Sequence, residues 1–80
     1  MECEDIEALI NGGLRCAQVK VLSEDKTHYE ALVVSEEFVG QSRIRRHQMI
    51  YGTLGALMGR EIHAMSIQAL TPEEWAAQGS

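Results

Sequence analysis

The sequence predicts a single α/β domain of the two-layer α+β kind, with the element order α-β-β-α-β-α. Three features of the chain predict it: two strand-like runs flanking a short polar segment, one long helical stripe, and a helix-capping sequence near the end. A right-handed crossover through the central helix places the third strand beside the hairpin in a three-stranded mixed sheet, with the helices on one face. Eighty residues supply one core, so residues 1–80 form one domain.

The first half of the chain predicts a helix followed by a β-hairpin. Apolar residues recur at helical spacing over about residues 4–12, where a glycine pair supplies the stop signal. Apolar and polar residues then alternate over residues 17–21, as in a half-buried strand. Residues 23–26 are polar and of hairpin length, and residues 27–35 are rich in β-branched and aromatic side chains, which favours a returning strand.

The middle of the chain predicts one long helix. Ser42 is a good N-cap, and the helix is expected to run to about Met58. The residues of its apolar face follow helical spacing: His47, Ile50, Tyr51, Leu54, Leu57 and Met58. Gly52 and Gly55 interrupt this helix, and we expect them to permit its close packing on the sheet.

The end of the chain predicts a third strand and a short helix. Residues 62–70 form the last apolar run. Thr71 then suits an N-cap, Pro72 suits the first helical position, and Glu74 completes a capping box. We expect this final helix to pack back on the domain through Trp75.

Composition and charge exclude several classes of function. The net charge of −5 argues against nonspecific binding to polyanions as the main activity, and no apolar run is long enough to span a membrane. The acidic start of the chain does not resemble a secretory signal. Cys3 and Cys16 show no CxxC spacing, and free thiols favour a cytoplasmic location. GxSxG, HExxH and P-loop motifs are absent from the sequence, so we expect no enzymatic activity.

Three of the seven basic residues cluster in Arg43, Arg45 and Arg46. They fall in the first turn of the predicted central helix, where the helix dipole disfavours cations. Two interpretations remain open: a solvated helix start with Glu36 and Glu37 nearby, or a contact with a nucleic acid or another partner. Aromatic residues are not interleaved with the arginines, which argues against stacking on single strands.

Two histidines open the two most apolar predicted strands. Each histidine lies at the start of its strand, so His28 and His63 can converge on one external ion. The alternative is a pair of surface or boundary histidines. A self-contained zinc site needs three or four ligands, so a tight metal site would be shared with a partner and none is expected in the isolated chain.

His47 lies on the apolar helical stripe, where a core or boundary role is favoured. The GxxG at residues 52–55 falls inside the predicted helix, where it is a weak sign of nucleic-acid binding.

Two longer runs carry a family resemblance. Residues 38–51 (FVGQSRIRRHQMIY) resemble the central motif of the BolA family, and residues 62–75 (IHAMSIQALTPEEW) resemble its C-terminal signature. With the predicted strand of residues 27–35, the resemblance covers nearly the whole chain, and it is closest to the short bacterial acid-stress branch. It implies a type II KH-like fold, which agrees with the predicted order of elements.

The resemblance also implies a function. It indicates a non-enzymatic adaptor in iron–sulfur cluster assembly or trafficking that pairs with a monothiol glutaredoxin. In such complexes a [2Fe–2S] cluster is held by the glutaredoxin cysteine, a glutathione thiol and ligands of the BolA-like partner. By motif match His63 takes the family histidine position. The second family ligand lies in the hairpin and is Cys or His; His28 matches it, because residues 23–27 contain no cysteine.

Two alternatives to the adaptor remain. The family includes transcriptional regulators, so the chain is alternatively a nucleic-acid-binding regulator of the stress response that uses Arg43, Arg45 and Arg46. The acidic net charge weakens this alternative, and we expect at most weak binding to DNA. The third alternative is a stress protein that acts through protein contacts alone, without a cluster.

Overall fold

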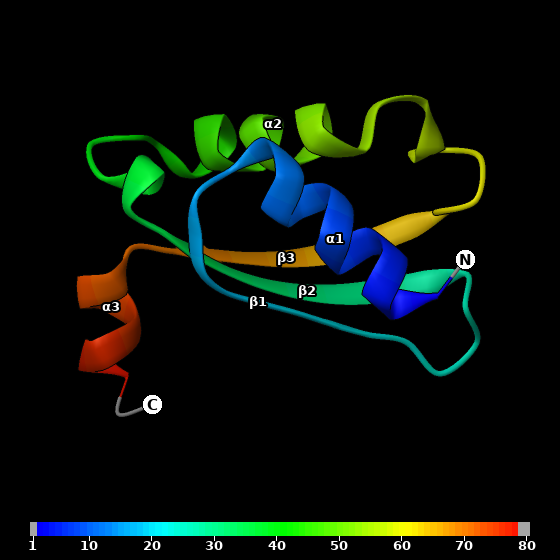
Figure 1. Ribbon diagram of the computed structural model, residues 1–80, viewed down its shortest axis with the longest axis horizontal. Helices are drawn as coiled ribbons and strands as arrows, with labels where there is room; N and C mark the ends of the chain where they lie inside the picture. Colours follow the sequence, from blue (N-terminus) through cyan, green and yellow to red (C-terminus); the bar gives the residue numbers. More distant parts are fainter. Residues whose placement is uncertain (1, 79–80) are drawn as a thin grey trace.

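The computed structural model describes residues 2–78, so residues 1, 79 and 80 of the predicted domain lie outside the described part. Its elements are, in chain order, α1 (Cys3–Gly13), β1 (Cys16–Leu22), β2 (His28–Ser35), the 3₁₀ turn η1 (Glu36–Phe38), α2 (Arg43–Leu54), the 3₁₀ turn η2 (Gly55–Leu57), β3 (Ala64–Leu70) and α3 (Pro72–Ala77). Figure 1 shows one curved sheet with helices packed on it. The predicted element order and three-stranded mixed sheet are confirmed.

The sheet has β2 at its centre, with β1 and β3 on either side. β1 pairs with β2 antiparallel, and β2 pairs with β3 parallel through the crossover that contains α2. Ala31 lies opposite Val21 on one side and Ile67 on the other. Because β2 and β3 run in the same direction, both strands start at the same end of the sheet. That end carries His28 and His63.

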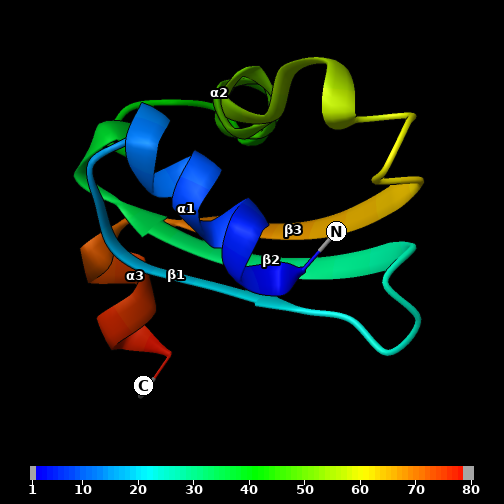
Figure 2. The same cartoon turned by 45° about the vertical axis from the view of Figure 1, so that its right-hand side comes forward.

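α1 and α2 cover one face of the sheet, and α3 lies on the opposite side at the far end of the strands (Figures 1 and 2). The expectation that all helices share one face is therefore wrong for α3. Val34 explains its place: the side chain is buried, 1% exposed, yet it does not belong to the core cluster formed with α1 and α2. α3 contacts this region of β2 and β3, and its Trp75 is half-buried there. Elsewhere on this sheet face Glu30, Ser66 and Gln68 are exposed and Leu32 is half-buried.

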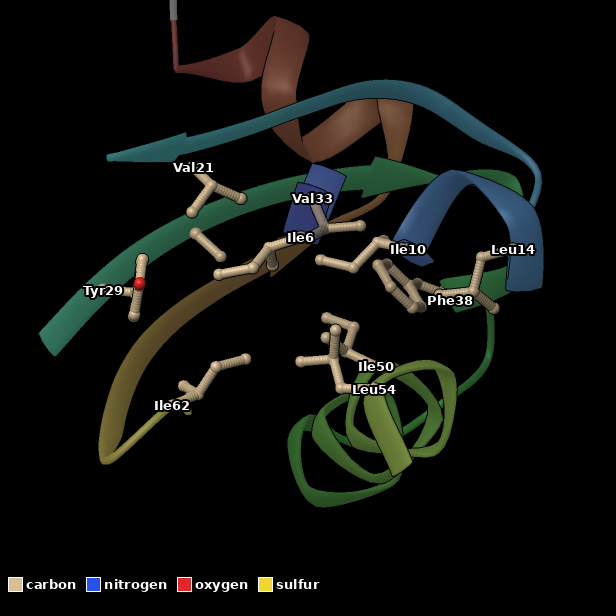
Figure 3. Close-up of a cluster of buried hydrophobic side chains, with 11 residues drawn as sticks. Ile6, Ile10, Leu14, Val21, Tyr29, Val33, Phe38, Ile50, Leu54 and Ile62 are labelled. Atoms are coloured by element: carbon tan, nitrogen blue, oxygen red, sulfur yellow. The ribbon is translucent and has the colours of Figure 1, made fainter. Parts of the chain in front are cut away.

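The hydrophobic core fills the space between the sheet and the two covering helices, as Figure 3 shows. Ile6 and Ile10 project from α1, and Ile50 and Leu54 from α2. The sheet and the connections contribute the remaining large side chains: Leu14, Val21, Tyr29, Val33, Phe38 and Ile62. Burial of each such side chain is worth about 1.5–3 kcal/mol, which fixes the helices on the sheet.

Glycines mark two differences from the predicted helices. α2 ends at Leu54 and not near Met58, because Gly55 takes a left-handed φ of 57° and caps the helix. A Cβ on Gly52 or Gly55 would meet nothing within 4 Å. The expectation that these two glycines permit close packing of the helix is therefore wrong. The close approach occurs at Gly13, where a Cβ would lie 2.5 Å from Thr53 Cγ2. α1 includes this glycine instead of stopping before it.

β3 begins two residues later than predicted. Ile62 is fully buried and forms an isolated bridge with Met58, and His63 lies in the bend between that bridge and Ala64. His63 is therefore placed just outside the strand. Among the described residues, none of the helices is long and apolar enough to cross a membrane.

Candidate metal-ligand site and partner surface

The backbones of His28 and His63 lie side by side at one end of the sheet. His28 is the first residue of β2 and is in register with Ala64, the residue after His63. The His63 N–H donates a hydrogen bond of 3.1 Å to the carbonyl oxygen of Thr27, the residue before His28. Both histidines are exposed. The parallel pairing of β2 and β3 thus brings together two residues that are 35 positions apart in the sequence.

The loop that precedes His28 is held by its own polar side chains. Asp25 Oδ1 accepts the backbone N–H groups of Thr27 and His28, each at 2.9 Å, which is an Asx-type turn. Ser23 Oγ accepts the N–H of Lys26 at 2.8 Å and donates to the carbonyl oxygen of His28 at 2.7 Å. These bonds fix the main chain on both sides of His28.

Asp25 also contacts the imidazole ring directly. Its Oδ2 lies 3.0 Å from His28 Nδ1. Hydrogen bonds from the His28 ring, the His28 N–H and the Thr27 N–H, in that order of effect, hold the pKa of the Asp25 carboxyl well below its usual range. Asp25 was not predicted as a site residue from the sequence. The available signal was an Asp in a polar loop, three residues before a candidate ligand.

The surface beside His28 is hollowed on the sheet face that α1 and α2 leave open. Acidic side chains line the hollow together with His28: Glu24, Asp25 and Glu30. Ala64 lines it, whereas His63 is not among the lining residues. The two imidazoles therefore flank the start of the paired strands and do not share one enclosed pocket.

The described residues contain no group of three or more His, Cys, Asp or Glu side chains that could hold a metal ion. Cys16 pairs with Ser35 in the register, at the end of the sheet away from His28, and burial raises the pKa of its thiol. Burial also raises the pKa of the Cys3 thiol. The two imidazoles at this end are too few for a self-contained site of three or four ligands, so a tightly bound metal ion would need further donors from a partner.

The structure divides the three arginines. Arg46 is committed to the fold: its guanidinium donates to the carbonyl oxygens of Gln41 at 3.0 Å and Ala69 at 3.1 Å, and lies 2.7 Å from Glu74 Oε1. Its Cζ is also 6.0 Å from the centre of the Phe38 ring. Only 14% of its side chain is exposed, so it has little surface for another partner.

Arg43 and Arg45 are exposed at the start of α2 and remain candidates for partner contact. The interpretation of a solvated helix start places Glu36 and Glu37 near the arginines, but the acidic partner of Arg46 is Glu74. Glu37 instead accepts the backbone N–H of Arg15 at 2.6 Å. The cluster of three basic residues in the sequence thus provides two exposed charges in the structure.

The exposed arginines and the histidine pair lie at opposite ends of β3. Arg43 lines a hollow with Ala69 and Leu70, at the end of the strand, whereas His63 precedes its first residue. Seven strand residues span about 20 Å at about 3.3 Å per residue. A partner that covers one candidate site therefore does not need to cover the other.

His47 and the GxxG sequence at residues 52–55 both belong to α2 and its C-terminal end. His47 is half-buried, and its ring meets that of Tyr51 edge to face at 6.4 Å between centroids, consistent with the expected boundary role. Gly52 lies in the last turn of α2, and Gly55 begins η2. The GxxG thus sits at the end of the helix instead of inside it, and it is not a loop between two long helices.

The sequence and the fold of this chain are similar to those of known proteins. The chain matches the sequence model of the BolA-like protein family over residues 12–74. It is 39% identical over 77 residues to the acid stress protein IbaG of Escherichia coli K12, which covers 95% of this chain and 90% of that protein. It is 38% identical over 53 residues to the Haemophilus influenzae protein named DNA-binding transcriptional regulator BolA, with 66% of this chain and 52% of that protein covered. The BolA domain of SufE1 from Arabidopsis thaliana superposes with a TM-score of 0.81 at 29% identity, covering 90% of this chain and 93% of that domain. The chain belongs to the BolA-like protein family.

Proposed function

We propose that this protein is a non-enzymatic adaptor that pairs with a monothiol glutaredoxin and carries a shared [2Fe–2S] cluster. The observation that carries the proposal is the adjacency of His28 and His63 at one end of the sheet, both exposed and neither part of the core. Exposed imidazoles at neighbouring strand starts are accessible to a partner's metal centre. Neutral imidazole nitrogens are suitable iron ligands.

The number of donors requires a partner. His28 and His63 supply the two terminal ligands of one iron, and the glutaredoxin cysteine and a glutathione thiol supply those of the other iron. Imidazoles carry less negative charge than thiolates, which raises the reduction potential of such a cluster. A protonated imidazole cannot bind iron, so binding also depends on pH. A cluster of this kind suits transfer or sensing, in keeping with the name of the acid stress relative.

Reconstitution tests the proposal. The protein is mixed with a monothiol glutaredoxin, glutathione, iron and sulfide, and visible circular dichroism is recorded against glutaredoxin alone and this protein alone. We expect a heterocomplex spectrum different from that of the glutaredoxin cluster and no stable cluster or tightly bound zinc on the isolated chain. A spectrum identical to that of glutaredoxin alone, without a heterocomplex on gel filtration, would count against the adaptor.

A second function is supported by a separate observation. Arg43 and Arg45 are exposed at the start of α2, and a relative of this chain is named as a DNA-binding transcriptional regulator. In this function the two arginines contact phosphates, and the acidic body of the protein limits the affinity. The salt dependence of binding to duplex DNA, compared between the wild type and a variant without these two arginines, tests it.

A further inference from the structure

We propose that Asp25 is a positioning residue that prepares His28 to bind a metal through Nε2. It does so by holding the ring in the tautomer that carries its proton on Nδ1. The inference rests on the proposed function for the identity of the metal, the iron of a shared cluster. The preparation of the ring itself is a property of this chain and is measurable without a partner.

The tautomer follows from the chemistry of the contact. Asp25 Oδ2 lies 3.0 Å from His28 Nδ1, a hydrogen-bond distance. An ionised carboxylate accepts hydrogen bonds and cannot donate them, so Nδ1 must carry the proton. In a neutral imidazole the other nitrogen, Nε2, then has a free lone pair. Nε2 is therefore the atom that is available to a metal.

The main chain restricts the ring further. Asp25 uses both of its oxygens, Oδ1 for the N–H groups of Thr27 and His28 and Oδ2 for the ring. The His28 carbonyl oxygen accepts from Ser23 Oγ at 2.7 Å. The backbone on both sides of the Cα atom and one ring nitrogen are thus held by the same short loop, which limits the directions that Nε2 can take.

The contact is poorly placed to stabilise the fold. The side chains of His28 and Asp25 are 66% and 55% exposed, and exposed pairs contribute little to stability. By contrast, histidines that bind metals commonly donate their second ring N–H to a carboxylate, which fixes the tautomer and makes the ligand more basic. The exposed contact between Asp25 and the His28 ring is therefore better explained by orientation of a metal ligand than by stabilisation of the fold.

Asp25→Asn is a direct test. The asparagine keeps one oxygen for the backbone N–H groups of Thr27 and His28 and turns its NH₂ group towards the ring. Since NH₂ only donates, Nδ1 must accept, and the ring proton moves to Nε2, where it blocks a metal. Glu24→Gln is the matched control, because it removes the same charge from the same loop without touching the ring. Asp25→Ala is a second variant that removes both oxygens.

The first measurement is long-range ¹H–¹⁵N NMR of the histidine ring nitrogens in the isolated chain, at a pH high enough for the imidazole rings to be neutral. We expect the proton of His28 on Nδ1 in the wild type and in Glu24→Gln, and on Nε2 in Asp25→Asn. Backbone amide shifts in the same samples report whether the loop is retained. A wild-type ring that carries its proton on Nε2 would overturn the inference.

The second measurement is a titration with Zn²⁺ alone, followed at the His28 ring nitrogens. We expect weak binding through Nε2 in the wild type, binding weaker by about 10-fold in Asp25→Asn and Asp25→Ala, and little change in Glu24→Gln. Equal affinity in all four proteins, or the same loss in Glu24→Gln, would show that Asp25 does not position the ligand. If both measurements agree with expectation but the wild type forms no cluster with glutaredoxin, the proposed function fails and the role of Asp25 stands.

Discussion

Arg46 and Glu74 form an ion pair, with 2.7 Å between Nη1 and Oε1, that joins the beginning of α2 to the beginning of α3. The same guanidinium donates to the carbonyl oxygen of Ala69 near the end of β3, and Glu74 accepts the backbone N–H of Thr71 in the capping box of α3. One arginine therefore connects three elements. This contact removes it from the basic surface that the sequence suggests.

Arg46→Ala should lower the free energy of unfolding by about 1–3 kcal/mol, because Ala69 and Glu74 both lose a charged donor. Arg45→Ala is the control: its side chain is exposed, so its effect should stay within about 0.5 kcal/mol. Urea denaturation followed by far-UV circular dichroism measures both. Equal losses in the two variants would mean that the Arg46 contacts do not stabilise the fold.

The double variant Arg43→Ala, Arg45→Ala tests binding to nucleic acid without disturbing this network. For the wild type we expect weak, salt-sensitive binding to duplex DNA. The variant should flatten the plot of log affinity against log salt by about 0.9 for each phosphate that an arginine no longer neutralises. Fluorescence anisotropy at several salt concentrations measures the slope. Tight, sequence-selective binding of the wild type at physiological salt would favour the regulator over the adaptor.

The elements that the sequence predicts well are those with strong local signals. The stripe of α2, the alternation of β1 and the capping box of α3 are all local patterns; β1 and α3 form where their patterns lie, and α2 follows its stripe as far as Leu54. The adjacency of His28 and His63 was predictable too, because a parallel crossover places the starts of β2 and β3 together.

Other features depend on contacts that no local pattern encodes. Arg46 and Glu74 are 28 residues apart, and many acidic residues were equally plausible partners. The short α3 buries none of its own residues completely, so its own sequence carries no strong signal for the side of the sheet that it occupies. The glycine pair of α1 indicated a helix end, whereas one of its members allows the crossing with α2.

Gly12 and Gly13 provide a matched pair within α1. A Cβ at Gly12 would meet nothing within 4 Å, so Gly12→Ala should stabilise the protein by about 0.5–1 kcal/mol through helix propensity. A Cβ at Gly13 would lie 2.5 Å from Thr53 Cγ2 and 3.0 Å from Thr53 Cβ, so either the Thr53 side chain or the crossing of α1 and α2 must shift. Gly13→Ala should therefore destabilise by about 1–3 kcal/mol. Thermal and urea denaturation compare the two; stabilisation by both would contradict the close crossing.

Acid should affect the fold through Glu74. Its hydrogen bond to Arg46 is the largest cause that lowers the pKa of this carboxyl below the ordinary 4.5. A carboxyl with a lowered pKa in the folded state contributes stability that is fully present above its unfolded pKa and is lost as pH falls through the folded value. Stability measured by urea denaturation should thus fall below about pH 4.5. Glu74→Gln should reduce that loss, whereas Glu73→Gln, in the same turn, should not. An unchanged acid slope in Glu74→Gln would exclude this contribution.

Substitution of the three histidines separates metal binding from packing. Since His63 and His28 are exposed, His63→Ala and His28→Ala should change the free energy of unfolding by less than about 0.5 kcal/mol. His63→Ala should change the visible circular dichroism of the cluster in the glutaredoxin complex, and His28→Ala should change it less. His47→Ala should do the opposite: the loss of its edge-to-face packing with Tyr51 should cost about 0.5–1.5 kcal/mol and leave the spectrum unchanged.

The wild-type complex should also lose its cluster signal as the solution is acidified, since a protonated histidine does not bind iron. The Glu74 carboxyl has a pKa below the ordinary 4.5, so we expect the isolated chain to remain folded while the cluster dissociates. Parallel titrations of the visible signal of the complex and the far-UV signal of the isolated chain separate the two events. If His63→Ala retains a cluster with the wild-type spectrum, lifetime and pH profile, His63 is not a ligand.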